Sequence, residues 1–115
     1  MGETLGGRIR ELRTERGWSL RTLAEKAKVN YSYLSKIENG KLEHTPSVRA
    51  LVDVSKAFGV DDLELMRLAK RLPSVLDSIR SPEAVQFLRR ASQTLETPDQ
   101  WSAMLRHMEA RYGKR

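Results

Sequence analysis

Apolar residues recur along most of this chain at the three- to four-residue spacing of amphipathic helices. The clearest stretch runs from residue 18 to residue 40, where two helix-start signals lie about a dozen residues apart. Ser19 can cap a first short helix and Asn30 a second, because each side chain can accept a hydrogen bond from an unpaired backbone N–H. The pattern therefore predicts two short helices joined by a tight turn. The positions expected to share one core are Leu20, Leu23, Ala24, Ala27, Val29, Leu34 and Ile37.

Another helix is predicted before this pair. Leu5, Ile9 and Leu12 have helical spacing, so we expect a first helix that ends near Arg16, preceded by a loose glycine-rich arm at residues 1–7.

Two more helices are predicted after the pair. Thr45 is expected to cap the first of them, with Pro46 at the first helical position and Gly59 at the end. The segment Asp61-Asp62-Leu63-Glu64 has the pattern of an acidic capping box, and the apolar stripe that follows ends at Leu72.

The remainder of the chain predicts a second helical unit. A short apolar turn (Val75, Leu76, Ile79) leads to two helix starts, Ser81-Pro82-Glu83 and Thr97-Pro98-Asp99-Gln100. The fold class is therefore all-α: a five-helix domain in residues 1–72 and an αα-hairpin in residues 73–115.

Two helices this short cannot bury both of their apolar stripes without a partner. We expect the hairpin in residues 81–112 to pair with the same hairpin of a second copy, giving a homodimer. The alternative is that it folds back on its own domain. The residues expected at the dimer interface are Leu88, Trp101, Met104, Leu105 and Met108.

The charge balance favours a polyanionic partner. The formal net charge is +6, with a surplus of +4 up to Leu72 and +2 beyond it. No cysteine is present, the two histidines lack metal-site spacing, and no nucleophile–base pair or phosphate loop is found, so no enzyme activity, metal or cofactor is expected. No apolar run approaches the ~20 residues of a membrane span and no signal peptide is recognised, so the protein is expected to be cytoplasmic, without membrane contact.

The second helix of the pair has an unusual outward face. It presents hydroxyls, an amide and a cation with little acid, which are groups that can contact base edges in a DNA major groove. Glu38 is expected to lie on the flank and pair with a nearby base such as Arg13.

These residues resemble the Cro-like, xenobiotic-response-element (XRE) family of helix-turn-helix repressors. The resemblance lies in LAEKA at 23–27, YLSKIENGK at 33–41 and the following Pro46-Ser47. It implies a compact DNA-binding domain and candidate contacts to double-stranded DNA. Members often carry Gln where this chain has Leu20, so contacts at that end would come from Arg21 or a backbone amide. The implied base-reading residues are Tyr31, Ser32, Ser35 and Lys36, and the implied phosphate contacts are Arg21, Tyr33, Asn39 and Lys41, with core packing an equal alternative for Tyr33.

The two-part architecture is similar to that of the Sin repressors within this family, and more distantly to the deinococcal damage-response repressors. This similarity implies a dimeric repressor on a palindromic operator, located at the nucleoid, whose hairpin could also bind an antirepressor protein. Two alternatives stay open: a protein-interaction adaptor on the same fold, and the antitoxin or controller half of a toxin–antitoxin or restriction–modification pair.

Overall fold

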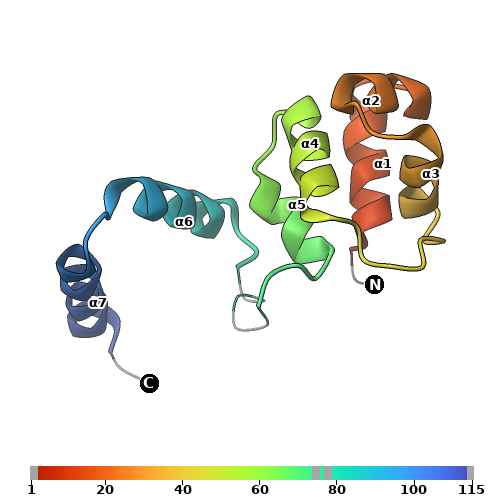
Figure 1. Ribbon diagram of the computed structural model, residues 1–115. Coiled ribbons are helices and arrows are strands. Elements are labelled where there is room, and N and C mark those ends of the chain that lie inside the picture. The colour runs from red at the N-terminus through yellow and green to blue at the C-terminus, as the bar shows by residue number, and fades with distance from the viewer. Residues whose placement is uncertain (1–2, 74–75, 77–78, 114–115) are drawn as a thin grey trace. The chain divides into compact units, whose positions relative to one another are not determined.

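The computed structural model describes residues 3–73, 76 and 79–113. They are helical, with no strand among them, and divide into two compact units, residues 1–80 and 81–115. The all-α fold class is confirmed (Figure 1). The helices of the first unit are α1 (Leu5–Glu15), α2 (Leu20–Ala27), α3 (Tyr31–Glu38), α4 (Val48–Phe58) and α5 (Asp62–Leu68).

The first unit is built around a single core in which α2 packs against both α3 and α4. Helix α1 lies along α3, and α4 packs against α5 (Figure 1). The buried side chains include five of the seven apolar positions predicted for the central pair, while Leu20 and Val29 are partly buried and pack against the core. The most deeply buried apolar residues are Ile9, Leu23, Leu34, Leu51, Val54 and Leu65.

The prediction of a loose glycine-rich arm at residues 1–7 is wrong, because α1 already begins at Leu5. Thr4 caps the helix, and its Oγ1 accepts a hydrogen bond from the Gly7 N–H at 3.0 Å. Gly6 is buried, and a Cβ at this position would lie 2.5 Å from the carbonyl oxygen of Ile37. This glycine therefore allows the start of α1 to approach the last turn of α3.

The caps predicted for the central pair are confirmed. Ser19 Oγ accepts a hydrogen bond from the Thr22 N–H at 3.0 Å, and Asn30 Oδ1 accepts one from the Tyr33 N–H at 3.1 Å. Between the two helices, Lys28 adopts a left-handed conformation with φ of 58°. This residue ends α2 and sets the direction of the chain into α3.

Helix α4 begins two residues later than predicted. Its cap is Ser47, whose Oγ accepts from the Ala50 N–H at 3.1 Å, and not Thr45. The carbonyl groups of Thr45 and Pro46 accept hydrogen bonds from Arg71 at 3.2 and 2.9 Å, so these two residues belong to the preceding loop. The predicted end of the helix at Gly59 is confirmed by its φ of 72°.

Helix α5 is shorter than its apolar stripe suggests. Asp61 caps it, accepting from the Leu63 N–H at 2.9 Å, and Glu64 accepts a hydrogen bond from Arg8 Nε at 2.5 Å. The helix ends at Leu68, and Lys70 is left-handed with φ of 58°, so Leu72 lies beyond the helix. This early end releases Arg71 to reach the loop before α4.

The second unit contains α6 (Pro82–Thr94) and α7 (Pro98–Tyr112). Both predicted starts are confirmed: Ser81 caps α6, and Thr97 and Gln100 form a full capping box on α7. The two helices meet where they are joined, and their axes then diverge, giving an open hairpin (Figure 1). Of the apolar turn expected before this unit, Val75 lies outside the described residues.

Candidate nucleic-acid interface

The α3 helix has one buried and one outward face. Leu34 and Ile37 are only 0% and 5% exposed, so they fix the helix on the core. Tyr31, Ser32 and Lys36 are exposed on the other side, and Ser35 is half-buried beside them. The polar side chains singled out in the sequence therefore share one accessible surface, although Ser35 is less open than the others.

Both ends of α3 are fixed by local hydrogen bonds. Beyond the Asn30 cap at the start, the Lys41 N–H donates to the carbonyl of Lys36 at 2.8 Å, across a left-handed Gly40 with φ of 67°. A rigid short helix of this kind can present its side chains at fixed spacing.

Tyr33 is tied to the loop that precedes α4. Its ring packs against the core, and its hydroxyl accepts a hydrogen bond from the Ser47 N–H at 3.0 Å. The same hydroxyl retains its own hydrogen as a donor. The core packing considered for Tyr33 is therefore confirmed, and its phosphate contact stays a prediction.

Glu38 lies at the end of α3 and is held by two arginines of α1. Its carboxylate accepts from Arg13 Nε and Nη2 at 2.8 and 3.0 Å and from Arg10 Nε at 3.2 Å. The predicted pairing with Arg13 is confirmed. The hydrogen bond to Glu38 raises the pKa of Arg13 above its ordinary value, and burial opposes this effect only in part. The one acidic side chain of α3 is thus neutralised away from the outward face.

Asn39 joins this network at the exposed edge. Its Oδ1 accepts from Arg10 Nη2 at 3.1 Å, and its Nδ2 donates to the carbonyl of Ser35 at 2.9 Å. Lys41, which follows two residues later, is exposed. Asn39 is thereby oriented by the protein itself, whereas Lys41 is free to turn toward a ligand.

At the other end of α3, Arg21 reaches across from the first turn of α2. Its Cζ lies 5.2 Å from the ring centroid of Tyr31, within the range of a cation–π interaction. Sequence reasoning treated these two residues separately. Nothing in their spacing of ten positions indicates the contact, which depends on the angle between α2 and α3.

The contacts of two further arginines were not predicted. Arg10 contacts both Glu38 and Asn39, and Arg71 holds the loop that connects α3 to α4. The position of Arg10, three residues before Arg13 on the same helix face, was the available signal for the first. No comparable signal exists for Arg71, because its partners are backbone carbonyls 25 and 26 residues away.

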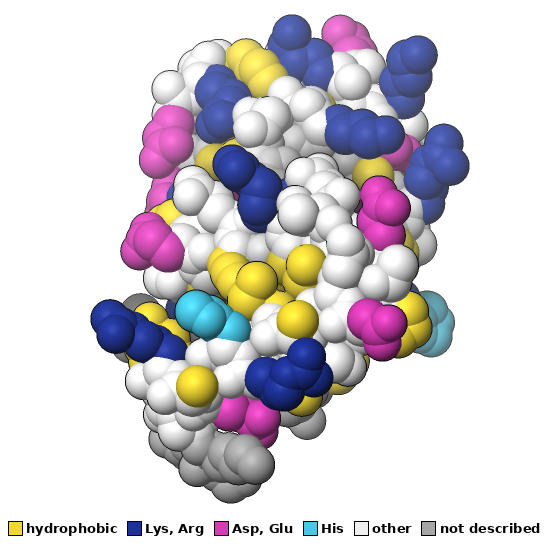
Figure 2. All heavy atoms as spheres, turned by 90° about the vertical axis from the view of Figure 1, so that its left-hand side faces the viewer, with side chains coloured by type: hydrophobic (Ala, Val, Ile, Leu, Met, Phe, Trp, Pro, Cys, Tyr) yellow, Lys and Arg dark blue, Asp and Glu magenta, His cyan; other side chains and the backbone are white. Residues whose placement is uncertain are grey.

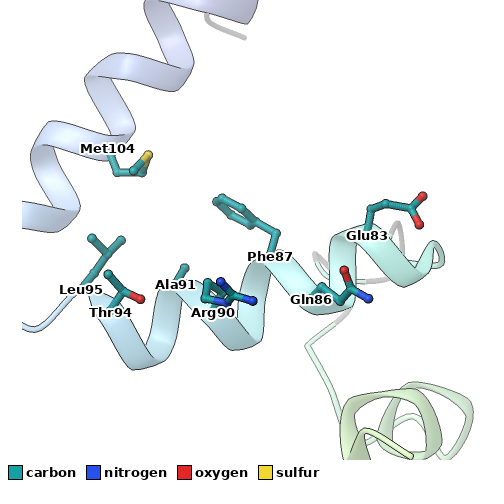
Figure 3. A pocket seen from close by; sticks show the side chains of 8 residues that line it. All are labelled: Glu83, Gln86, Phe87, Arg90, Ala91, Thr94, Leu95 and Met104. Carbon is teal, nitrogen blue, oxygen red and sulfur yellow. The ribbon is translucent and has the colours of Figure 1, made fainter.

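The second unit exposes an apolar surface. Phe87, Trp101, Leu105 and Met108 are each about half exposed, and none of the residues of α7 is buried. A hollow of about 350 Å³ lies between the helices, and Phe87, Leu95 and Met104 point into it (Figure 3). Hydrophobic side chains also gather in the middle of the face that Figure 2 shows, with both basic and acidic side chains around them.

The described part of the chain offers neither a metal-binding cluster nor a membrane-spanning helix. Residues 3–73, 76 and 79–113 contain no cluster of three or more side chains that could hold a metal ion. Within the same ranges, no helix is both long enough and apolar enough to cross a membrane.

Known proteins share the helix-turn-helix segment of this chain. The helix-turn-helix family profile matches residues 9–65. The HTH-type transcriptional regulator SinR of Bacillus subtilis is 48% identical over 56 residues, which is 49% of this chain and 50% of SinR. The regulator DdrOP3 of Deinococcus deserti is 36% identical over 59 residues, 51% of this chain and 44% of DdrOP3. These matches span about half the length of the relatives.

A solved structure extends the likeness beyond the first unit. A chain of the SinR protein/SinI protein complex aligns with a TM-score of 0.53 and 31% identity, covering 96% of this chain and all of that one. The central helix pair, its caps and this end-to-end similarity lead to one conclusion: the chain belongs to the XRE family of helix-turn-helix transcriptional regulators.

Proposed function

We propose that this protein is a sequence-specific, dimeric DNA-binding repressor that inserts α3 into the major groove of a palindromic operator. The observation that carries the proposal is the two-faced character of α3. Buried Leu34 and Ile37 hold the helix, while Ser32 and Lys36 face away from the protein. The second helix of such a pair is the one that enters the groove in this class of motif.

Base reading is assigned to the outward residues of α3. Lys36 can donate to guanine O6 or N7, and the hydroxyls of Ser32 and Ser35 can donate or accept with either type of base. The ring of Tyr31, which is 45% exposed, offers an apolar surface for a thymine methyl group. These four residues are the base-reading side chains that α3 itself contributes.

Phosphate contacts are assigned to residues around the edge of this surface. Lys41 is an exposed cation next to the end of α3, Asn39 is oriented there by Arg10, and the hydroxyl of Tyr33 keeps a donor. Arg21 supplies positive charge at the other end. Such contacts set the register of the protein on the duplex and make binding dependent on salt.

Dimerisation is assigned to the second unit. An open pair of helices with no buried residue in α7 exposes more apolar surface than an independent unit of this size can tolerate. A second copy offers an identical surface, so the two stripes can bury each other about a two-fold axis. The residues placed at this interface are Leu88, Trp101, Met104, Leu105 and Met108.

The same surface is a candidate site for an inhibitory protein. The solved relative is a complex between SinR and SinI, so a second protein is recorded with that member of the family. A helical antirepressor that covered the apolar stripe here would compete with the second copy. Repression would then be relieved by loss of the dimer.

The experiment is a selection of genomic DNA fragments by the full chain, followed by measurement of Kd for the selected site and for random duplex at one stated salt concentration. A sequence-specific regulator should prefer its site by ~10³-fold or more and should protect two half-sites about 34 Å apart. Equal binding to selected and random DNA would overturn the proposal and favour the adaptor.

A further inference from the structure

The contact with Tyr31 fixes the orientation of the Arg21 guanidinium. The guanidinium lies over the ring at 5.2 Å, and both side chains are exposed. Arg21 makes no ion pair with a carboxylate in the described part of the chain, so the hydrogen-bond donors of its planar group are available. Stacking on a ring holds this group in one orientation and lowers the entropy lost when it binds.

The neighbouring arginines do not compete for this position. Arg13 donates to Glu38 and to the carbonyl of Trp18, and Arg10 donates to Glu38 and Asn39. Of these three arginines, Arg21 is the one that the structure holds at the beginning of α3.

We propose that Arg21 reads a guanine in the operator, with the ring of Tyr31 as its platform, and that the two residues act as one base-reading unit. The inference rests on the proposed function, but it replaces the phosphate contact given to Arg21 there with a specificity-determining role for a residue outside α3. Ordinarily a cation in the first helix of such a pair contacts the DNA backbone, because that helix crosses the phosphates. Here the stacking draws the guanidinium to the first residue of α3, where side chains reach base edges.

The chemistry of the two possible contacts differs enough to be tested. A phosphate contact needs a positive charge, which a lysine also supplies. A guanine contact uses two parallel N–H donors toward O6 and N7, which the compact ammonium group of lysine cannot reproduce in the same geometry. The substitution Arg21→Lys therefore separates the two roles.

The experiment measures Kd for the selected operator, for every single base-pair change in one half-site, and for random duplex. The proteins compared are the full chain and its variants R21K, Y31L, Y31F, the double variant R21K/Y31L, and K26A as a matched control. Lys26 Nζ lies 4.9 Å from the Trp18 ring, so it is also a cation stacked on an aromatic ring and is also located in α2.

The wild-type chain should disfavour replacement of one G·C pair by about 5- to 150-fold. Both R21K and Y31L should lose this preference at that same pair. R21K should retain the preferences at all other pairs, and Y31L should retain them except at a thymine that the Tyr31 ring contacts, which also shows that the variants are folded. Because the unit acts through both residues, the double variant should lose no more at this G·C pair than either single variant. Y31F and K26A should keep the wild-type pattern.

Other results would overturn the inference. If R21K keeps every base preference, or if it weakens operator and random duplex by the same factor, Arg21 contacts phosphate. If Y31L and R21K act at different base pairs, the two residues do not form a unit. A wild-type chain with no base preference at all would instead refute the proposed function, which distinguishes that failure from this one.

Discussion

Arg13 and Glu38, which are 25 residues apart in the sequence, join α1 to the last residue of α3 through two hydrogen bonds from one guanidinium. The Glu38 side chain is 2% exposed and that of Arg13 is 16% exposed, so this ion pair is largely removed from water. A buried charge that loses its partner is costly, because nothing else compensates for its lost hydration. The orientation of α3 therefore depends on this pair.

Substitution of Glu38 by Gln should lower the free energy of unfolding by about 3 kcal/mol, since Arg13 would stay buried without a carboxylate. Urea denaturation followed by circular dichroism measures the change. The control is Glu25→Gln on the exposed surface of α2, which should change stability by less than about 0.5 kcal/mol. Equal effects of the two substitutions would show that the pair contributes little.

Substitutions at the neighbouring residues Gly6 and Gly7 test how closely α1 packs on α3. A Cβ at Gly6 would lie 2.5 and 2.7 Å from the backbone carbonyl oxygens of Ile37 and Glu38, which cannot move freely. Gly6→Ala should therefore destabilise the protein by about 2 kcal/mol or more. Gly7→Ala should have a much smaller effect, because the nearest atom is Thr4 Oγ1 and alanine favours a helix. Thermal unfolding compares them, and a tolerated Gly6→Ala would contradict the close approach.

Ser55 within α4 and Ser47, the cap before it, should respond differently to replacement by alanine. Ser55 is 1% exposed and its hydroxyl makes no hydrogen bond, so Ser55→Ala should be neutral or should stabilise the protein by about 1 kcal/mol. Ser47 caps the helix, so Ser47→Ala should destabilise it by about 1 kcal/mol. Midpoints of urea unfolding give both values. A clear loss of stability in the Ser55 variant would mean that its hydroxyl has a partner.

If the proposed dimer forms through α7, an added charge should disrupt it on one face of this helix and not on the other. Leu105→Glu places a carboxylate in the apolar stripe and should convert the dimer into a monomer at about 10 μM, because burying that charge costs several kcal/mol. Ala110→Glu adds the same charge to the opposite side of the helix and should leave the dimer intact. Sedimentation equilibrium measures the mass. A dimeric Leu105→Glu variant would remove this helix from the interface.

Much of the fold could be predicted because helix starts are local. Ser19, Asn30, Ser81 and Thr97 cap the helices that their positions indicate, since the cap and the N–H group it accepts from are three residues apart. The prediction of a cap at Thr45 failed for a non-local reason. Arg71, far along the chain, donates hydrogen bonds to the carbonyl groups of Thr45 and Pro46 and so holds them in the loop before α4.

The outward face of α3 was also predictable, because two apolar anchors in an eight-residue helix fix its orientation. The helical start of α1 at residues 5–7 was not predictable, since a glycine is compatible with both a flexible segment and close packing. At Gly6, only the position of α3 decides between the two. The stacking of Arg21 on Tyr31 depends in the same way on tertiary geometry.

The most direct measurement is the effect of Lys36→Ala on binding to the selected operator and to random duplex, compared with Lys56→Ala. Both lysines are exposed, but Lys36 lies on the outward face of α3 and Lys56 lies in the last turn of α4. Lys36→Ala should reduce operator binding relative to random DNA by about 1–3 kcal/mol, and Lys56→Ala should leave that ratio unchanged. An unchanged ratio for Lys36→Ala would contradict the placement of α3 in the groove.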